Sequence, residues 1–184
     1  MTTALADELV GTYTLDVAHS RIGFAARHAM VTKVRGAFNE FEGTAKLPTP
    51  DPRTWNVQLA IQAGSIDTRN EQRDGHLRGG DFLSLEEYPT ISFNSTSVEQ
   101  VGESTFRVTG DLTVRGVTRP VSVDFEYEGA ATDPFGNSRV GFEGSASISR
   151  KDFGITFNAA LDTGGVLVSD KVDLEFEISA IKAA

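Results

Sequence analysis

The chain has 184 residues, 39% hydrophobic and 23% charged, a composition typical of one globular domain with a full core. A formal net charge of −9 without a basic run argues against nucleic-acid binding and against electrostatic docking on anionic membranes. Because the chain has no cysteine, disulfides, thiolate metal sites and cysteine nucleophiles are excluded.

The N-terminus and the hydropathy of the chain predict its setting. We expect residues 1–184 to form a single domain and residues 1–10 to be a loose N-terminal extension. The start MTTALADELVGTY has neither a basic region nor an apolar signal region, and no stretch approaches the roughly 18 apolar residues of a membrane span. We therefore expect a cytoplasmic protein with no stable membrane insertion.

The first third of the chain alternates apolar and polar residues, as half-buried strands do. A run around Tyr13 is followed by a second run, and the two form either one long bent strand or two short ones. The shared face of the second run carries Ile22, Phe24, Ala26 and His28. After Phe38 the apolar positions change parity, which indicates a bulge near Asn39 or Glu40.

The stretch from Ile66 to Phe93 breaks this alternation, and we interpret it as a helical insertion. Thr68 followed by Glu71 fits a capping box, and Gly79-Gly80 ends the helix. A second short turn is predicted at Ser84–Glu87. Its apolar residues are Phe82, Leu83, Leu85 and Tyr88. The insertion is either a polar helix and an apolar plug at a barrel mouth, or a crossover packed against an edge strand.

The second half of the chain alternates more regularly, and it contains a predicted hairpin that turns near Gly116. The apolar positions on one face include Phe106, Val108, Leu112, Val114, Val121, Val123, Phe125, Val140, Phe142, Ala146, Ile148, Val172, Leu174, Phe176 and Ile178. Charged residues occupy the opposite face of the same strands. A large antiparallel sheet that is wetted on one side must fold onto itself.

These patterns predict a mainly β fold, an extended antiparallel β-barrel of about eight strands with a short helical insertion. Small residues interrupt the inner apolar rows at Gly110, Gly116, Gly144 and Ala146. They either leave room for a ligand or mark bulges and barrel corners.

Five ordered segments resemble the signatures of the YceI-like family, whose members include polyisoprenoid-binding proteins. They are Asp16-Val17-Ala18-His19-Ser20, GFAARHAMVTKVRGAFNEFEG, SIDTRNEQRDGHLRGGDFLSLEEYPTISF, GDLTVRGVTRPV and SISRKDFGI. The resemblance extends from about Gly11 to Ile178. It implies a lipocalin-like barrel that holds a long apolar chain in its lumen. Many relatives carry a secretory signal, and the start of this sequence does not resemble one. We therefore expect that their periplasmic setting does not transfer to this chain.

We therefore expect noncatalytic binding, storage or transport of a polyisoprenoid, an isoprenoid quinone or a fatty-acid-like lipid, without a cofactor. The alternatives are an enzyme acting on such a lipid in the same cavity, or an interaction module with a filled barrel. The expected ligand contacts are Phe24, Ala26, His28, Phe38, Phe82, Leu85, Val108, Leu112, Val123, Phe125, Phe142, Ala146, Ile148, Leu174 and Phe176.

Catalytic and metal-binding patterns are weak in this sequence. The histidines, His19, His28 and His76, lie in separate segments without metal-ligand spacing, and no hydrolase or phosphate-loop motif is present. His28 points either into the barrel, toward a lipid head group, or to a backbone carbonyl. Four cations lie near predicted strand ends: Arg115, Arg119, Arg150 and Lys151. They either bind a phosphate or carboxylate at a barrel opening or are simply exposed to solvent. We expect no metal site.

The oligomeric state is predicted from the less regular side of the barrel. The parity change near Asn39 and the helical insertion leave apolar groups there, and the family resemblance implies dimers. We therefore expect a homodimer with twofold symmetry.

Overall fold

Strands make up most of the chain, and the structure, a computed structural model, describes residues 3–161 and 165–184. Its elements in chain order are α1 (Thr3–Leu9), β1 (Gly11–Leu15), η1 (Val17–His19), β2 (Arg21–His28), β3 (Thr32–Phe38), β4 (Phe41–Leu47), η2 (Pro52–Thr54), β5 (Asn56–Gln62), η3 (Ala63–Ser65), β6 (Ile66–Asp67), α2 (Glu71–Arg78), β7 (Thr90–Gln100), β8 (Thr105–Val114), β9 (Val117–Thr132), β10 (Ser138–Ser149), η4 (Arg150–Phe153) and β11 (Lys171–Lys182). The η elements are 3₁₀ turns.

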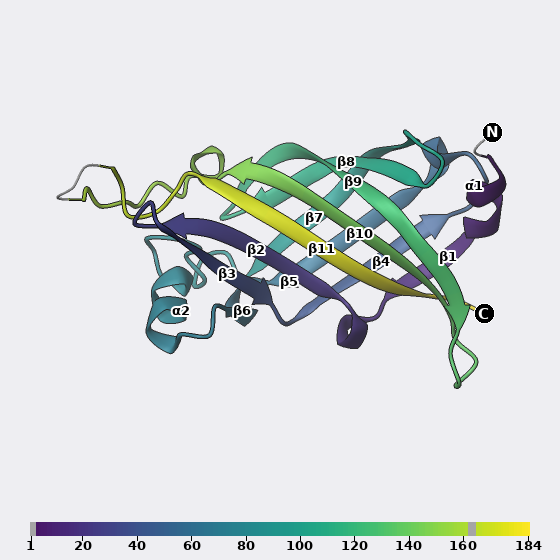
Figure 1. The fold of residues 1–184 in the computed structure, drawn as a ribbon, viewed down its shortest axis with the longest axis horizontal. Coiled ribbons are helices and arrows are strands. Elements are labelled where there is room, and N and C mark those ends of the chain that lie inside the picture. Colours follow the sequence, from purple (N-terminus) through teal and green to yellow (C-terminus); the bar gives the residue numbers. More distant parts are fainter. Residues whose placement is uncertain (1–2, 162–164) are drawn as a thin grey trace.

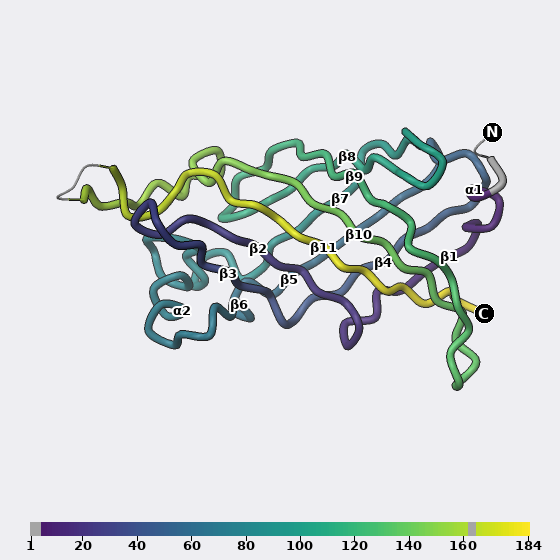
Figure 2. The backbone as a smooth tube through the Cα atoms, in the orientation of Figure 1, coloured from purple at the N-terminus to yellow at the C-terminus, as the bar shows by residue number. Residues whose placement is uncertain are grey.

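Eight antiparallel strands close into a barrel in the order β1-β4-β5-β7-β8-β9-β10-β11, with β11 returning to β1. The closing pairs are Tyr13 with Lys182 and Leu15 with Ala180. Strands β9, β10 and β11 run along most of an elongated molecule (Figure 1; Figure 2). The predicted extended antiparallel barrel is confirmed.

Alternation along the hairpin of β8 and β9 decides which side chains face inward. Phe106 and Val108 are buried, whereas the alternate residues Arg107 and Thr109 point outward. Arg107 forms an ion pair with Asp124 across the strands, 2.8 Å between Nε and Oδ1. Such cross-strand pairs stabilise the wet face while the apolar rows build the core.

Strands β2, β3 and β6 extend the sheet beyond the barrel. The first part of β11, around Asp173–Glu177, pairs with β2, whereas its last residues pair with β1. Of the two alternatives for the segment before residue 30, the structure has two short strands, which pair with different parts of β11 and have β4 and β3 as their other neighbours. Near Asn39 the expected bulge is wrong, because β3 ends there and a corner leads to β4. The amide N–H groups of Asn39 and Glu40 both donate to Ser65, to its carbonyl and to its hydroxyl.

The helical insertion covers the side on which β2 and β3 leave the barrel (Figure 1). Helix α2 begins at Asn70, whose Oδ1 accepts from the Arg73 amide at 3.0 Å, and so the expected cap at Thr68 is wrong. Thr68 instead donates its N–H and its hydroxyl to the buried carboxylate of Asp74. This loop-to-helix bond fixes the angle at which α2 leaves β6.

Two apolar clusters form the core of the barrel. The α1-end cluster consists of the buried residues Ala6, Leu9, Tyr13, Leu47, Trp55, Val98, Phe106, Val108, Val140 and Ala180. The α2-end cluster consists of Ile22, Phe41, Ile61, Ala63, Ile66, Phe82, Leu83, Ile91, Val114, Phe153 and Ile155. Within the described ranges, no helix is long and apolar enough to cross a membrane.

Candidate functional site

A cavity of about 240 Å³ lies inside the barrel, and its wall includes most of the α1-end cluster together with Ile22, Ile61 and Ile91 of the α2-end cluster. Every barrel strand contributes to its wall. The wall consists of Leu9, Tyr13, Leu15, Ile22, Gly23, Phe24, Phe38, Gly43, Thr44, Ala45, Leu47, Trp55, Val57, Gln58, Leu59, Ile61, Ile91, Phe93, Val98, Phe106, Val108, Leu112, Val121, Val123, Phe125, Val140, Phe142, Leu174, Phe176, Ile178 and Ala180.

The wall is apolar in its chemistry, and it includes no Asp, Glu, Lys, Arg or His among the described residues. Its two large amphipathic side chains have their polar atoms occupied. The Tyr13 hydroxyl donates to the Leu9 carbonyl at 3.0 Å, and Trp55 Nε1 donates to the Thr49 carbonyl at 2.8 Å. Burial, helped by Tyr127, raises the pKa of Tyr13 above its ordinary value, so the phenol stays neutral. Such a wall suits hydrocarbon.

Nine of the predicted contact residues lie on this wall. They are Phe24, Phe38, Val108, Leu112, Val123, Phe125, Phe142, Leu174 and Phe176. Alternation along the strands places them there, because residues two apart in a strand share a face. That they contact a ligand stays a prediction.

The other six predicted residues lie off the wall. Phe82 is buried in the α2-end cluster, and Leu85 and Ile148 pack against the same cluster. Ala26 and Ala146 are half-buried on β2 and β10. His28 is exposed at the end of β2, where it pairs with Val168, so it does not face the cavity.

Aromatic rings lie beside the inner glycines, for which the sequence left open either room for a ligand or bulges and corners of the barrel. Gly144 lies opposite Phe125 on one side and opposite Phe176 on the other. A Cβ on Gly144 would lie 2.8 Å from the Phe125 ring, and the two phenylalanine ring centroids are 5.8 Å apart. The glycine therefore seats a ring instead of opening the lumen. Phe125 packs against the α1-end cluster and Phe176 against the α2-end cluster, and both rings belong to the cavity wall.

The α1 end of the cavity is covered by a segment that sequence reasoning missed. Residues 1–10 were expected to be a loose extension, but Thr3–Leu9 forms a helix whose Ala6 and Leu9 are 1% exposed. Leu9 belongs to the cavity wall. A seven-residue helix is too short to be stable alone, so the signal was weak, and packing onto the open barrel mouth decides its structure.

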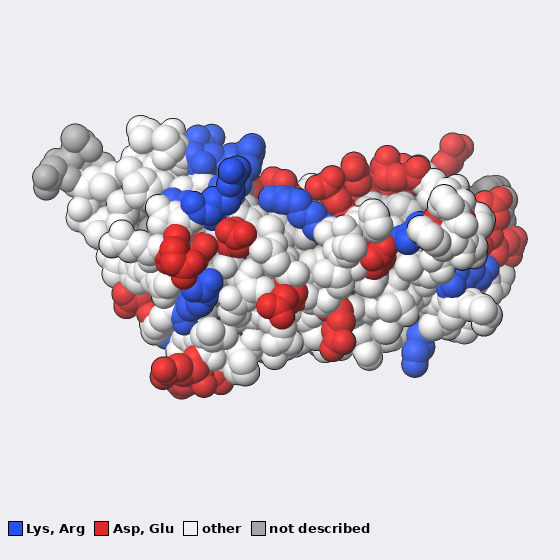
Figure 3. Space-filling model, turned by 90° about the horizontal axis from the view of Figure 1, so that it is seen from below, with Lys and Arg blue, Asp and Glu red and all other residues white. Residues whose placement is uncertain are grey.

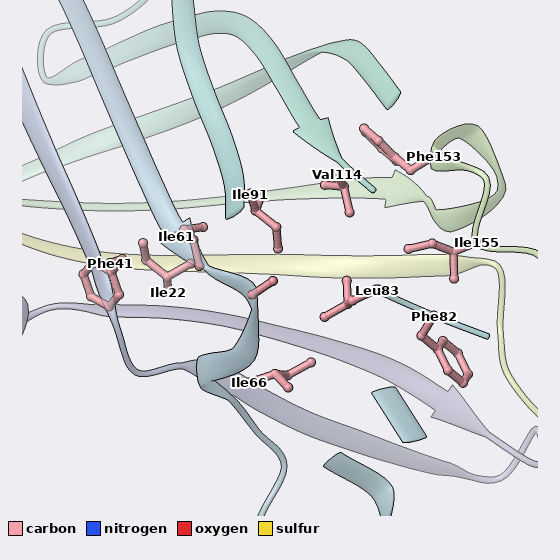
Figure 4. Packing of buried hydrophobic residues seen from close by; sticks show 11 residues of the cluster. Ile22, Phe41, Ile61, Ile66, Phe82, Leu83, Ile91, Val114, Phe153 and Ile155 are labelled. Carbon is pink, nitrogen blue, oxygen red and sulfur yellow. The ribbon is translucent and has the colours of Figure 1, made fainter. Parts of the chain in front are cut away.

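The α2 end is closed by the apolar part of the insertion together with the segment after η4. Leu83, Val114 and Ile155 point into one shared space (Figure 4). Further out, the rings of Phe82, Phe157 and His76 lie 5.0–5.3 Å from one another. The insertion is therefore part of the main core as well as a cover.

Arginine side chains tie this closure together through backbone carbonyls. Arg115 donates to the Phe82 carbonyl at 2.7 Å. Arg150 is 4% exposed and donates to the carbonyls of Ser169, Ile155 and Val168. Burial lowers the pKa of Arg150 below its usual value, and Asp170 opposes this effect. The guanidinium groups of Arg115 and Arg150 thus bind backbone carbonyls, whereas Arg119 and Lys151 are exposed.

The three histidines do not meet. His19 Nδ1 lies 2.8 Å from Asp16 Oδ2 and His76 Nε2 lies 2.8 Å from Asp81 Oδ2, both at the surface. Within residues 3–161 and 165–184, no three acidic or histidine side chains are placed to hold a metal ion.

Comparison with known proteins agrees with this geometry. The model of the YceI-like domain family matches residues 13–180. The chain belongs to the YceI-like family. Among the relatives of this YceI-like chain, the UPF0312 protein SA2479 of Staphylococcus aureus (strain N315) is 38% identical over 169 residues, which cover 91% of this chain and 95% of the relative.

Solved structures share the YceI-like barrel. BcnA of Burkholderia cenocepacia has a TM-score of 0.78 and 24% identity, covering 90% of this chain and 98% of BcnA. The Campylobacter jejuni YCEI protein has a TM-score of 0.73 and 26% identity, covering 86% and 90%. A polyisoprenoid binding domain from Saccharophagus degradans has a TM-score of 0.71 and 16% identity, covering 93% and 98%. At such identities BcnA and the Saccharophagus domain show the fold alone.

Proposed function

We propose that this YceI-like protein binds the hydrocarbon chain of an isoprenoid or another long-chain lipid in its lumen and stores or carries it without chemical change. The observation that carries the proposal is the wall of apolar side chains that surrounds the cavity inside the barrel. Burying a five-carbon isoprene unit contributes roughly 3–4 kcal/mol before the entropy cost of association. Affinity for such a ligand comes from this wall.

The size of the cavity favours a short section of chain. An apolar cavity of about 150 Å³ holds one benzene molecule, so by proportion about 240 Å³ admits on the order of ten carbon atoms, or two isoprene units. A longer lipid extends past Leu9 or displaces the Phe125–Phe176 pair. Because the wall offers no charged side chain, the head group stays outside the lumen. The Saccharophagus neighbour is a polyisoprenoid binding domain, which supports an isoprenoid as the first candidate.

A noncatalytic role is supported by the same wall. General acid–base chemistry needs a titratable group within hydrogen-bond reach of the reacting atoms. Among the described residues, the only such group on the wall is Tyr13, and its hydroxyl already donates to Leu9. We propose carriage and not turnover on this basis.

The test is lipid content. Purified protein is extracted with organic solvent, the extract is analysed by mass spectrometry, and a fluorescent fatty acid is used in competition. Ala45→Leu adds bulk to the wall, and we expect it to lower both bound lipid and probe affinity by about tenfold, since about 1.4 kcal/mol of lost burial has that effect. Ala130→Leu, at an exposed position of β9, is the matched control.

Two outcomes contradict the proposal. A dry protein that does not bind the probe would indicate a filled module, and chemical conversion of the extracted lipid on incubation would indicate an enzyme. Circular dichroism of both variants shows that the barrel is intact.

The cytoplasmic setting, the transport role and the homodimer stay predictions. For the homodimer, light scattering coupled to size exclusion is expected to give twice the chain mass of 19.8 kDa. A mass of one chain across a dilution series would contradict it.

A further inference from the structure

An apolar tip projects from the α2 end of the molecule, at the turn between β2 and β3. Met30 is 56% exposed and Val31 is 74% exposed. The segment leading into β11 runs beside this turn, and its Val166 is 39% exposed. The Ala29 amide donates to the Leu167 carbonyl at 2.8 Å, which holds the two segments together at one projecting end (Figure 2).

The backbone of this turn is unusual for the residues that it carries. Ala29 and Met30 have φ angles of 51° and 66°, and the Val31 amide donates to the His28 carbonyl at 3.1 Å. Both central residues of this tight turn have positive φ, a conformation that Asn and Gly adopt at less cost than Ala and Met. The chain keeps Ala-Met at a place where Asn-Gly would be more stable. Strain of this kind is typical of functional positions.

Basic residues surround the apolar tip. Between Asp16 and Glu40 the sequence has no acidic residue, in a chain with 26 of them. Arg27 and Lys33 face each other across the hairpin just before the turn, and Arg35 follows on the same face. All three are exposed, and none is in an ion pair within the described residues.

Neighbouring strand β11 does not cancel this charge. Lys171 and Asp173 of β11 lie 3.6 Å apart and neutralise each other. The charge of Lys33 also helps to lower the pKa of Asp173. Glu175 of β11 pairs with Arg21 of β2 at 3.6 Å. Figure 3 shows Lys and Arg side chains gathered toward the left part of the upper margin of the view, whereas Asp and Glu are more frequent farther right along the same margin.

We propose that the tip docks this protein on the surface of a bilayer containing anionic lipids. Met30, Val31 and Val166 enter the boundary between head groups and acyl chains, while Arg27 and Lys33 contact lipid phosphates. Exposed apolar side chains beside Lys and Arg are the combination that binds anionic interfaces. A protein partner matches this surface less well, because three apolar side chains on a narrow turn offer little area for a stable interface.

The total charge of −9 predicts no electrostatic docking for the molecule as a whole, but it does not describe this end. Screening limits the reach of charge to about 10 Å at 0.1 M salt. A bilayer therefore interacts with the basic tip. Repulsion between anionic lipids and the acidic rest of the protein keeps the long axis of the barrel pointing away from the membrane surface. This proposal stands without the identity of the lumen ligand.

Vesicle co-sedimentation tests the docking. The wild-type chain is mixed with vesicles of phosphatidylcholine alone or of phosphatidylcholine with phosphatidylglycerol, and binding is expected only to the second. Ala29→Asn, Met30→Gly and Val31→Thr in one chain give the turn its preferred residues and remove the apolar tip. We expect this variant to fold at least as well and to lose roughly tenfold or more in binding.

A charge variant and two controls separate the contributions. Arg27→Glu with Lys33→Glu should lower binding at least about twenty-five-fold, at about fivefold for each basic residue removed near an anionic surface. Phe135→Ser, at an 89% exposed position of the β9–β10 turn, and Lys46→Glu, on β4, lie away from the tip and should bind as wild type. Added salt should weaken the binding of wild type.

Three results would overturn the proposal. One is equal sedimentation of wild type with both kinds of vesicle. Another is equal loss in the control and tip variants. The third is no vesicle binding together with a tip variant of changed mass in light scattering, which would make the tip a contact between two copies of the chain. Thermal melting of each variant excludes unfolding as the cause of a loss.

Discussion

The two ends of the barrel are closed by different physical means. At the α1 end, strands β1 and β11 still pair, and Leu9 covers the opening through apolar contact plus the bond from Tyr13. At the α2 end, β2 and β3 leave the barrel, and arginines bind the backbone of the segments that fill the gap. Arg78 donates to the Gly64 and Ile66 carbonyls.

The two closures differ because backbone groups find their hydrogen-bond partners differently at the two ends. A closed ladder leaves no unpaired edge, so an apolar stopper is sufficient at the α1 end. Where strands separate, carbonyl groups that become buried need donors, and a guanidinium supplies several in one plane. The α2 end is thus a thick and polar-braced closure, and the α1 end is a thin apolar one.

The largest effect is expected from Phe82→Ala at the α2 end. Because Phe82 belongs to the buried core cluster, its removal should lower the free energy of unfolding by about 4 kcal/mol. Urea denaturation measures this, with the exposed Phe135→Ala as control at below about 0.5 kcal/mol. A loss under about 1 kcal/mol would make the segment a removable lid, as one interpretation of the sequence holds.

The arginine bracing is tested by Arg150→Met, which keeps most of the volume but removes the guanidinium donor from the carbonyls of Ser169 and Ile155. The Val168 carbonyl still accepts from Asn158 Nδ2 at 2.8 Å. We expect a loss of about 3 kcal/mol in the free energy of unfolding, since buried acceptors without partners are costly. Arg119→Met, at an exposed position, is the control and should be neutral. Equal stabilities of the two variants would mean that the carbonyls of Ile155 and Ser169 bind water instead.

The thin cover is tested by Leu9→Ala, which should cost about 2 kcal/mol and open the cavity wall at the α1 end. We expect faster exchange of a bound fluorescent fatty acid in solution. Glu8→Ala, on the same helix and exposed, should exchange as wild type. Faster exchange in Leu85→Ala, with Leu9→Ala unchanged, would place the opening at the α2 end instead.

The smallest effect concerns the surface network of Arg139, which bridges Asp16 and Asp133 with 2.5 Å and 2.7 Å contacts. Hydrogen bonds from Arg139 and then His19 lower the pKa of Asp16. Burial alone would raise the pKa of Asp133, but hydrogen bonds from Arg139 and Asn137 outweigh it and hold that pKa well below its usual range.

Both carboxylates have folded pKa values below the unfolded value of about 3.9, so their stabilisation is complete above that pH and is lost as pH falls toward the folded values. Arg139→Met should therefore lower the melting temperature at pH 7, and the difference from wild type should shrink below about pH 4. Arg53→Met, whose partner Asp51 lies in an exposed loop, is the comparison. A difference that is independent of pH would show that Arg139 acts through packing.

Local alternation by itself determined the fold class, the inward rows of β8, β9 and β11, and nine residues of the cavity wall. The reason is that the two-residue period of a strand assigns each side chain to a face before any partner is known. Leu112, Phe125 and Leu174 were placed correctly on this ground alone.

Only the tertiary structure decided the features that depend on which segment, distant in the sequence, packs beside a given position. Strand β9 brings the Phe125 ring into the space that Gly144 leaves. The barrel mouth at the α1 end gives the short helix with Leu9 a place to pack. His28 has the parity of inward residues, yet β2 has left the barrel by that point and the side chain is exposed. Parity is a property of one strand, whereas enclosure is a property of all strands that surround a position, and the second cannot be read from the first.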